Sequence, residues 1–218
     1  MKDFRIIFMG TPDFAVPSLK ILIENNYQIV AVLTAPDKPK GRGQKLIPSP
    51  VKQAALASGI PVLQPTNLKS PEFQEQLKKY DPNLQVVVAF RMLPEVVWNY
   101  PQYGTFNLHA SLLPQYRGAA PINWAIINGE KETGLTTFFL QHEIDTGNII
   151  EQEKIKILPE DNAGSLHDKM MHKGAQLVLK TVNNLAMDNY QLTVQQKAIN
   201  LKSAPKLSKE TTKIDWQK

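Results

Sequence analysis

Apolar and polar residues along the first hundred positions fall into blocks with two different spacings. Short runs of consecutive apolar residues predict buried strands at 4–9, 27–33, 61–63 and 84–90. Between these runs, apolar residues three or four positions apart predict a helix at 17–24 and two more that begin at Ser49–Pro50 and Ser70–Pro71. Serine followed by proline suits a helix start, because serine caps the first turn and proline fits the first helical position.

The second half continues this pattern with longer elements. We expect a strand at 104–109, two strands at 135–140 and 149–157 around a loop, and an amphipathic helix over 162–188. The polar stretch 35–50 contains several prolines and glycines, which predict irregular structure there. Strands that alternate with helices predict an α/β fold, with an open, mostly parallel, Rossmann-like sheet and helices on both of its faces.

Length and composition limit the class of protein. The chain has 218 residues and 42% of them are hydrophobic, enough for one sizeable core and at most a small second unit. It contains no cysteine, which excludes disulfides, thiolate chemistry and zinc sites built on sulfur. No apolar run reaches the roughly 18 residues of a membrane-spanning helix, and the N-terminus does not have the layout of a signal peptide. We therefore expect a cytoplasmic protein without a membrane partner.

Basic residues outnumber acidic ones, with a formal net charge of +5 and a pI of about 9.2. The excess is concentrated in two segments: 37–52, with five basic residues against Asp37 alone, and 197–218, with six lysines against two acids. Contact with a polyanion would explain such segments, and so would an ordinary solvated surface. Charge alone does not separate these two interpretations.

The turn after the first predicted strand lies where a dinucleotide fold places its glycine-rich phosphate loop. Here the turn reads Gly10-Thr11-Pro12-Asp13-Phe14, with a single glycine and with a proline that removes one amide donor. The G-x-G-x-x-G fingerprint is absent, which argues against NAD or FAD as a ligand.

Candidate chemistry is concentrated in the segment 107–122. Asn107 and His109 are two positions apart, so on a strand they project from the same face, at the end where open α/β sheets bind ligands. Histidine exchanges a proton near neutral pH, and an asparagine amide can donate to a developing oxyanion. Asp145, on a later loop, is a candidate to orient the histidine. The alternative is that Asn107 and His109 only satisfy backbone groups at the end of a strand.

The segment reads N-L-H-A-S-L-L-P-Q-Y-R-G-A-A-P-I and resembles the signature of the folate-dependent formyltransferases. The resemblance implies an α/β sheet domain, 10-formyltetrahydrofolate as formyl donor, and no metal. It also implies that Asn107, His109 and Asp145 are the catalytic group. The residues implied to line the folate site are Ser111, Leu112, Leu113 and Pro114, together with the run Phe90, Arg91, Met92 and Leu93, which is similar to the pteridine pocket of the glycinamide ribonucleotide enzymes.

Four further stretches resemble the branch of this family that acts on initiator methionyl-tRNA in translation initiation: 8–15, 35–46, 203–207 and 214–216. This resemblance implies that 1–188 is the catalytic domain and that 189–218 is a basic linker toward a C-terminal domain that the sequence does not contain. A monomer is the default expectation. The residues implied to bind the tRNA or its methionyl group are Arg42, Lys40, Lys45, Gly10 and Phe14.

Two alternatives stay open. A related formyltransferase could act on a sugar-nucleotide or a ribonucleotide amine, but the first turn lacks the phosphate loop of the ribonucleotide enzymes, and a sugar acceptor would not explain the basic stretch. A non-catalytic RNA- or folate-binding module is the second, and the presence of all three catalytic residue types argues against it. The remaining histidines, His142, His167 and His172, are interpreted as ordinary polar residues.

Overall fold

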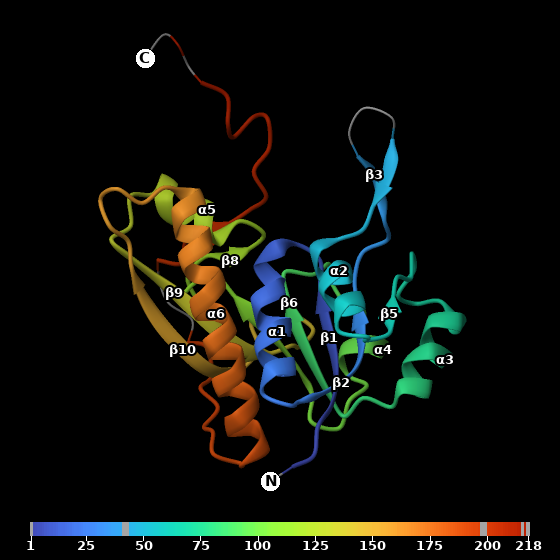
Figure 1. Ribbon diagram of the computed structural model, residues 1–218. Helices are drawn as coiled ribbons and strands as arrows, with labels where there is room; N and C mark the ends of the chain where they lie inside the picture. The colour runs from blue at the N-terminus through green and yellow to red at the C-terminus, as the bar shows by residue number, and fades with distance from the viewer. Residues whose placement is uncertain (1, 41–43, 197–199, 215, 217–218) are drawn as a thin grey trace.

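The computed structural model describes residues 2–40, 44–196, 200–214 and 216. Its centre is a seven-stranded sheet in the order β10-β9-β7-β6-β1-β2-β5, with helices on both faces (Figure 1). The strands are β1 (Arg5–Gly10), β2 (Gln28–Leu33), β5 (Val62–Leu63), β6 (Leu84–Val88), β7 (Thr105–His109), β9 (Glu132–Phe139) and β10 (Ile149–Lys156).

Five neighbouring strands, from β5 to β7, run parallel, while β9 is antiparallel to both β7 and β10. The predicted α/β fold with an open, mostly parallel sheet is therefore confirmed. Because β1, β6 and β7 run in the same direction, their carboxyl ends meet at one edge, which is where such sheets bind ligands.

Two apolar cores lie on opposite faces of this sheet. Side chains of β1 alternate between them: Ile6 and Phe8 belong to one core, and Ile7 and Met9 to the other. The first core is covered by α1 (Val16–Glu24), α2 (Pro50–Ala57), α5 (Pro121–Ile127) and α6 (Ala163–Ala186), and the second by α3 (Pro71–Tyr80) and α4 (Glu95–Trp98).

Three helices begin where polar residues cap them. The Ser49 hydroxyl accepts a hydrogen bond from Lys52 N, and the Ser70 hydroxyl accepts one from Phe73 N, so both predicted helix starts are confirmed. At the start of α6, Asn162 forms a reciprocal capping box. Each such cap stabilises its helix by about 1 kcal/mol.

The stretch 35–50 departs from the prediction of irregular structure. It contains an antiparallel hairpin, β3 (Lys38–Lys40) and β4 (Lys45–Ile47), in which Pro39 pairs with Leu46. Proline is tolerated there because a two-stranded ribbon has only edge strands. Figure 1 shows this hairpin standing out from the body of the domain.

Other departures are small. The strand predicted to reach residue 90 ends at Val88, because Ala89 has a φ of +49° and leaves the extended conformation. The short elements η1 (Asp13–Ala15), α4, α5, β8 (Arg117–Gly118) and β11 (Ser203–Ala204) were not predicted, since they are too short to show a hydrophobic period. None of the helices in the described part of the chain is both long and apolar enough to cross a membrane.

Candidate active site

Asn107 and His109 lie at the carboxyl end of β7, as predicted. In the sheet, Asn107 is paired with Val87 of β6 and Phe138 of β9, which fixes the register of both side chains. Both residues line a cavity of about 730 Å³, a size suited to a cofactor-sized ligand. The cavity also contains Asp145, from the loop between β9 and β10.

The His109 ring is buried and held by a backbone carbonyl. Only 6% of it is exposed, and its Nε2 lies 2.8 Å from the carbonyl oxygen of Tyr116. Because a carbonyl can only accept a hydrogen bond, Nε2 carries a proton. The other ring nitrogen, Nδ1, faces Asp145 Oδ2 at 3.9 Å. A protonated His109 thus has an acceptor on one side and a carboxylate on the other.

Residues 111–118, which follow β7, form the signature loop, and the backbone of this loop holds Asp145 in place. The Gly118 amide donates to its Oδ2 at 3.0 Å, and only 13% of its side chain is exposed. Its φ of +55° belongs to the left-handed region, which Asp visits more readily than most residues. The structure therefore brings together the three residues predicted to form the catalytic group.

His109 and Asp145 each have a hydrogen-bond partner, whereas the Asn107 side chain has none in residues 2–40, 44–196, 200–214 and 216. It is partly buried at the cavity wall, so its amide can donate to a group that enters the cavity. This is the property required of an oxyanion donor.

The cavity has two walls that come from different parts of the chain. One wall contains Phe90, Arg91, Met92 and Leu93, whose contact with folate stays a prediction, together with Leu140 to Asp145. The other is built from the first turn and the start of α5, with Pro12, Phe14, Ala119, Ala120, Pro121, Ile122 and His167 among its members. His109, Asn107 and Asp145 line the same space as both walls.

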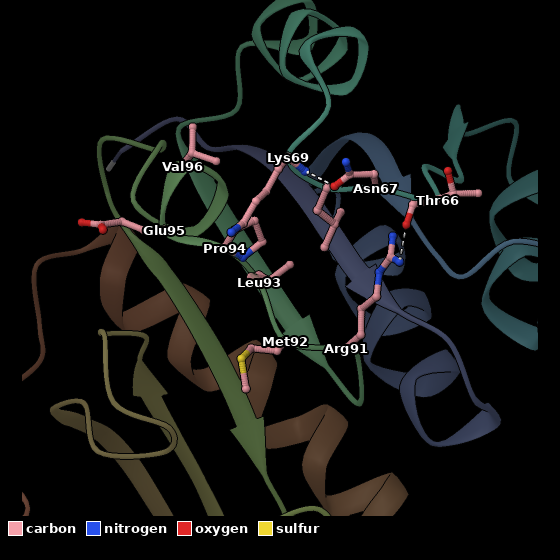
Figure 2. Close-up of a pocket in the computed structure, with 10 residues that line it drawn as sticks. Thr66, Asn67, Lys69, Arg91, Met92, Leu93, Pro94, Glu95 and Val96 are labelled. Carbon is pink, nitrogen blue, oxygen red and sulfur yellow. Dashed lines mark hydrogen bonds between the residues drawn. The ribbon is translucent and has the colours of Figure 1, made fainter.

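A second cavity, of about 880 Å³, adjoins the wall that contains Phe90 and shares Arg91, Met92 and Leu93 with it (Figure 2). Figure 2 shows Arg91 extending toward Thr66, where its guanidinium donates to the carbonyl oxygens of Thr66, at 3.0 Å, and Pro65. Arg91 therefore links two loops at the place where the two cavities meet.

The predicted folate contacts Ser111, Leu112, Leu113 and Pro114 do not line this cavity. The Ser111 hydroxyl donates to the carbonyl of Gln115 at 2.6 Å, and Leu113 packs in a small core cluster with Phe138 and Ile149. In this structure the four residues shape the loop that presents the Tyr116 carbonyl and the Gly118 amide. A direct contact with folate stays a prediction.

Of the residues predicted to bind tRNA or its methionyl group, Phe14 lines the cavity and is 6% exposed. Gly10 does not line this cavity, and a Cβ added to it would be 2.7 Å from the Cβ of Ala15. Arg42 lies outside the described residues. Lys40 is the last residue of β3 and Lys45 the first residue of β4, and their side chains are likewise outside the description.

A polar network ties the signature loop to the chain that follows α6. The Tyr116 hydroxyl donates to Glu130, and Lys202 Nζ donates to the same carboxylate. Burial raises the pKa of the Tyr116 phenol, and the hydrogen bond to Glu130 adds to this rise. The Lys202 ammonium, followed by the Tyr116 hydroxyl, holds the pKa of Glu130 below its usual range.

The sequence did not point to several residues of the site. His167, interpreted as an ordinary polar residue, lines the same wall as Phe14, with its ring centroid 5.2 Å from that of Phe14. Leu140 and Ile144 also line the cavity without having been predicted as site residues. Leu140 belongs to the strand expected at 135–140, and a single apolar residue such as Ile144 carries no pattern. Among the described residues, no group of three His, Asp or Glu side chains is close enough to hold a metal ion.

Comparison with known proteins agrees with this geometry. Residues 4–182 match the family model described as formyl transferase, and the chain belongs to that family. It is 57% identical over 218 residues to the methionyl-tRNA formyltransferase of Bacteroides fragilis, a match that covers 99% of this chain and 67% of that protein.

Solved structures share the fold at lower identity. The phosphoribosylglycinamide formyltransferase of Anaplasma phagocytophilum superposes with a TM-score of 0.74 at 22% identity, covering 94% of this chain and 100% of that one. The N-formyltransferase of Helicobacter canadensis, solved with folinic acid and dTDP-3-aminofucose, gives a TM-score of 0.71 at 24% identity, covering 99% and 76%.

Proposed function

We propose that this chain transfers the formyl group of 10-formyltetrahydrofolate to the α-amino group of initiator methionyl-tRNA, for translation initiation. The observation that carries the proposal is the 57% identity to a methionyl-tRNA formyltransferase over nearly the whole chain. The cavity that contains Asn107, His109 and Asp145 supports it independently, because it combines an oxyanion donor, a protonatable ring and a carboxylate.

The reaction forms one C–N bond and breaks another. The neutral amine attacks the formyl carbon, the carbonyl oxygen becomes an oxyanion, and the bond from carbon to folate N10 then breaks. His109 as imidazolium and the Asn107 amide stabilise the oxyanion, each by roughly 3 to 4 kcal/mol if they act like other oxyanion donors. The amine loses a proton and N10 gains one, and Asp145 helps this transfer while it sustains the charge on His109.

Each wall of the cavity suits one substrate. The wall from Phe90 to Leu93 is mainly apolar and joins the second cavity, which gives an elongated donor room beyond the reacting centre. The second wall, with Phe14 and Ile122, is apolar and suits the methionyl side chain. We propose folate on the first wall and the methionyl group on the second.

The β3–β4 hairpin is the proposed contact for the tRNA acceptor stem. It stands out from the domain and carries Lys38, Lys40 and Lys45 on its two strands (Figure 1). In the sequence, Arg42 falls between these two strands. Arginine can bind phosphate or a base edge through two parallel hydrogen bonds. Neutralised phosphates make such binding depend on salt.

We propose 1–188 as the catalytic domain and 189–218 as a basic linker segment. Within this segment, β11 pairs with β8 of the signature loop, so part of it lies against the domain. We further propose that the protein acts as a monomer in the cytoplasm.

The direct test supplies the protein with 10-formyltetrahydrofolate and charged initiator tRNA and measures formyl-methionine released from the tRNA. A dTDP-amino sugar and glycinamide ribonucleotide serve as competing acceptors. Formylation of methionyl-tRNA alone is the expected result. Formylation of the sugar or of the ribonucleotide instead would replace the proposed acceptor, while donor hydrolysis without any acceptor product would contradict the proposal.

A further inference from the structure

The chain returns to the site after α6. Ile149 of β10 and Thr193 exchange two backbone hydrogen bonds, of 2.8 and 2.9 Å, which fix this part of the chain beside the sheet. Two residues further along, Gln195 is half-buried and lies between the Asp145 loop and the signature loop.

The Gln195 carboxamide uses both of its ends. Its Nε2 donates to two carbonyl oxygens of one loop, that of Asp145 at 2.9 Å and that of Gly147 at 2.8 Å. Its Oε1 accepts from Arg117, from Nη2 at 2.6 Å and from Nε at 3.2 Å. Carbonyls only accept and guanidinium only donates, so this orientation of the amide is the one that satisfies all four contacts.

These contacts close a ring around Asp145. The Asp145 carboxylate accepts from the Gly118 amide, Gly118 follows Arg117, Arg117 donates to Gln195, and Gln195 donates back to the Asp145 carbonyl. The ring spans three segments far apart in sequence. Asp145 itself has a φ of +55°, a conformation that its surroundings must hold in place.

We propose that Gln195 is a positioning residue for catalysis, which fixes the Asp145 carboxylate opposite His109 by holding the backbone of the Asp145–Gly147 loop. The inference rests on the proposed function, because it assumes that Asp145 acts with His109. Arg117 acts indirectly, through Gln195. It does not line the cavity, and its guanidinium orients the Gln195 amide.

Substitution of Gln195 by glutamate tests this assignment. The Gln195→Glu variant retains the shape and the acceptor for Arg117, so the segment after α6 stays attached through a new ion pair. An ionised carboxylate cannot donate to the two loop carbonyls and repels them instead. We expect kcat for formyl transfer to fall by about 10- to 100-fold, as small misplacements of a reacting group do, while KM for methionyl-tRNA stays within about twofold.

Gln74→Glu provides a matched control. Gln74 is also half-buried and its Nε2 also donates to a backbone carbonyl, that of Leu68 at 2.8 Å, but it lies on α3 across the sheet from α6. Thermal unfolding of both variants reports whether the fold is retained. A folded Gln195→Glu variant with a kcat equal to that of the Gln74→Glu control would overturn the proposal.

Arg117→Ala and Gln195→Ala, alone and together, test the connection between them. Because Arg117 acts on Asp145 through Gln195, the double variant should lose little more kcat than Gln195→Ala alone. Independent, additive losses would contradict the ring of contacts.

Hydrogen exchange separates this inference from the proposed function. The Gly118 amide, which donates to Asp145, should exchange faster in Gln195→Glu than in the unaltered protein, whatever reaction the protein catalyses. If the unaltered protein transfers no formyl group, the proposed function fails, and the exchange rate still decides whether Gln195 holds Asp145. Unchanged exchange together with unchanged kcat rejects the positioning role alone.

Discussion

Asp145 faces His109 at a distance that allows attraction but no shared proton. The 3.9 Å between Asp145 Oδ2 and His109 Nδ1 is longer than a hydrogen bond, while the Gly118 amide occupies the same carboxylate oxygen at 3.0 Å. The carboxylate therefore acts on the ring mainly through its charge. Two buried side chains at this separation interact far more strongly than they would in water.

Replacement of the ring is the first test of the site. His109→Ala should abolish formyl transfer, because the oxyanion then loses its charged partner. His109 packs edge-on against Phe138, so unfolding must be measured beside turnover. His172→Ala, at an exposed position on α6, is the control and should retain full activity. Near-normal turnover by a folded His109→Ala variant contradicts the mechanism.

Asp145→Asn separates charge from geometry. Asparagine keeps an oxygen that can accept from the Gly118 amide, so the loop should stay in place while the negative charge beside His109 disappears. We expect kcat to fall by about 100-fold, in the range seen when one stabilising group of an oxyanion site is removed. The measurement is steady-state formylation of methionyl-tRNA with both substrates varied. An unchanged kcat would mean that Asp145 only shapes the loop.

The sequence predicted the main parts of the site because they follow from strand geometry. Asn107 and His109 share a face of β7 since side chains alternate along a strand, and parallel strands bring Phe90 to the same edge of the sheet. Their local motif was also long enough to place Asp145 beside them by resemblance.

Contacts made by long-range packing could not be predicted in this way. Gln195 reaches the Asp145 loop only because the chain reverses after α6 and pairs with β10, and nothing in a polar, aperiodic segment indicates that return. The β3–β4 hairpin was missed for a different reason. Its prolines and glycines predict irregular structure, whereas a two-stranded ribbon tolerates proline on either strand.

Arg42→Ala tests the proposed tRNA contact. We expect a marked rise in KM for methionyl-tRNA with little change in KM for 10-formyltetrahydrofolate, because neither β3 nor β4 contributes a residue to the lining of the two cavities. The slope of log(kcat/KM) against the logarithm of the salt concentration should also become shallower, by the amount that one lost phosphate contact accounts for. Lys156→Ala, exposed on β10, is a charge-matched control that should leave the slope unchanged. Equal effects on both substrates would show that the hairpin does not read tRNA.

Asp161 gives a prediction for stability against pH. Its carboxylate accepts from Lys169 Nζ, from the Leu158 amide and from Ser165, and the hydrogen bond from Lys169 contributes most to holding its pKa below the ordinary 3.8. A carboxyl with a lowered pKa stabilises the fold above its unfolded pKa and loses this effect as pH falls through the folded pKa. Asp161→Asn should therefore be less stable than the unaltered protein at neutral pH.

The difference should shrink as the pH falls below 3.8, where Asp161 becomes protonated and resembles asparagine. Urea unfolding at several pH values measures it. Glu160→Gln, at the exposed neighbouring position, should show no such pH-dependent difference. A gap between Asp161→Asn and the unaltered protein that is the same at all pH values would contradict the linkage.

Gly147 lies where the loop that carries Asp145 packs tightly against the sheet. A Cβ built there would lie 1.6 Å from the carbonyl oxygen of Phe139, the last residue of β9. That backbone cannot retreat, because β9 is paired with strands on both sides, so the loop that carries Asp145 must move instead. We expect Gly147→Ala to lower the free energy of unfolding by roughly 2 kcal/mol or more, as overpacking does, and to remove most of the activity.

The control is Gly129→Ala, where φ is +65° but no atom lies within 4 Å of the added Cβ. It should cost about 1 kcal/mol from backbone strain and leave kcat unchanged. Chemical unfolding and formylation assays on both variants decide the matter, and a fully active Gly147→Ala variant would show that Asp145 does not depend on this close approach.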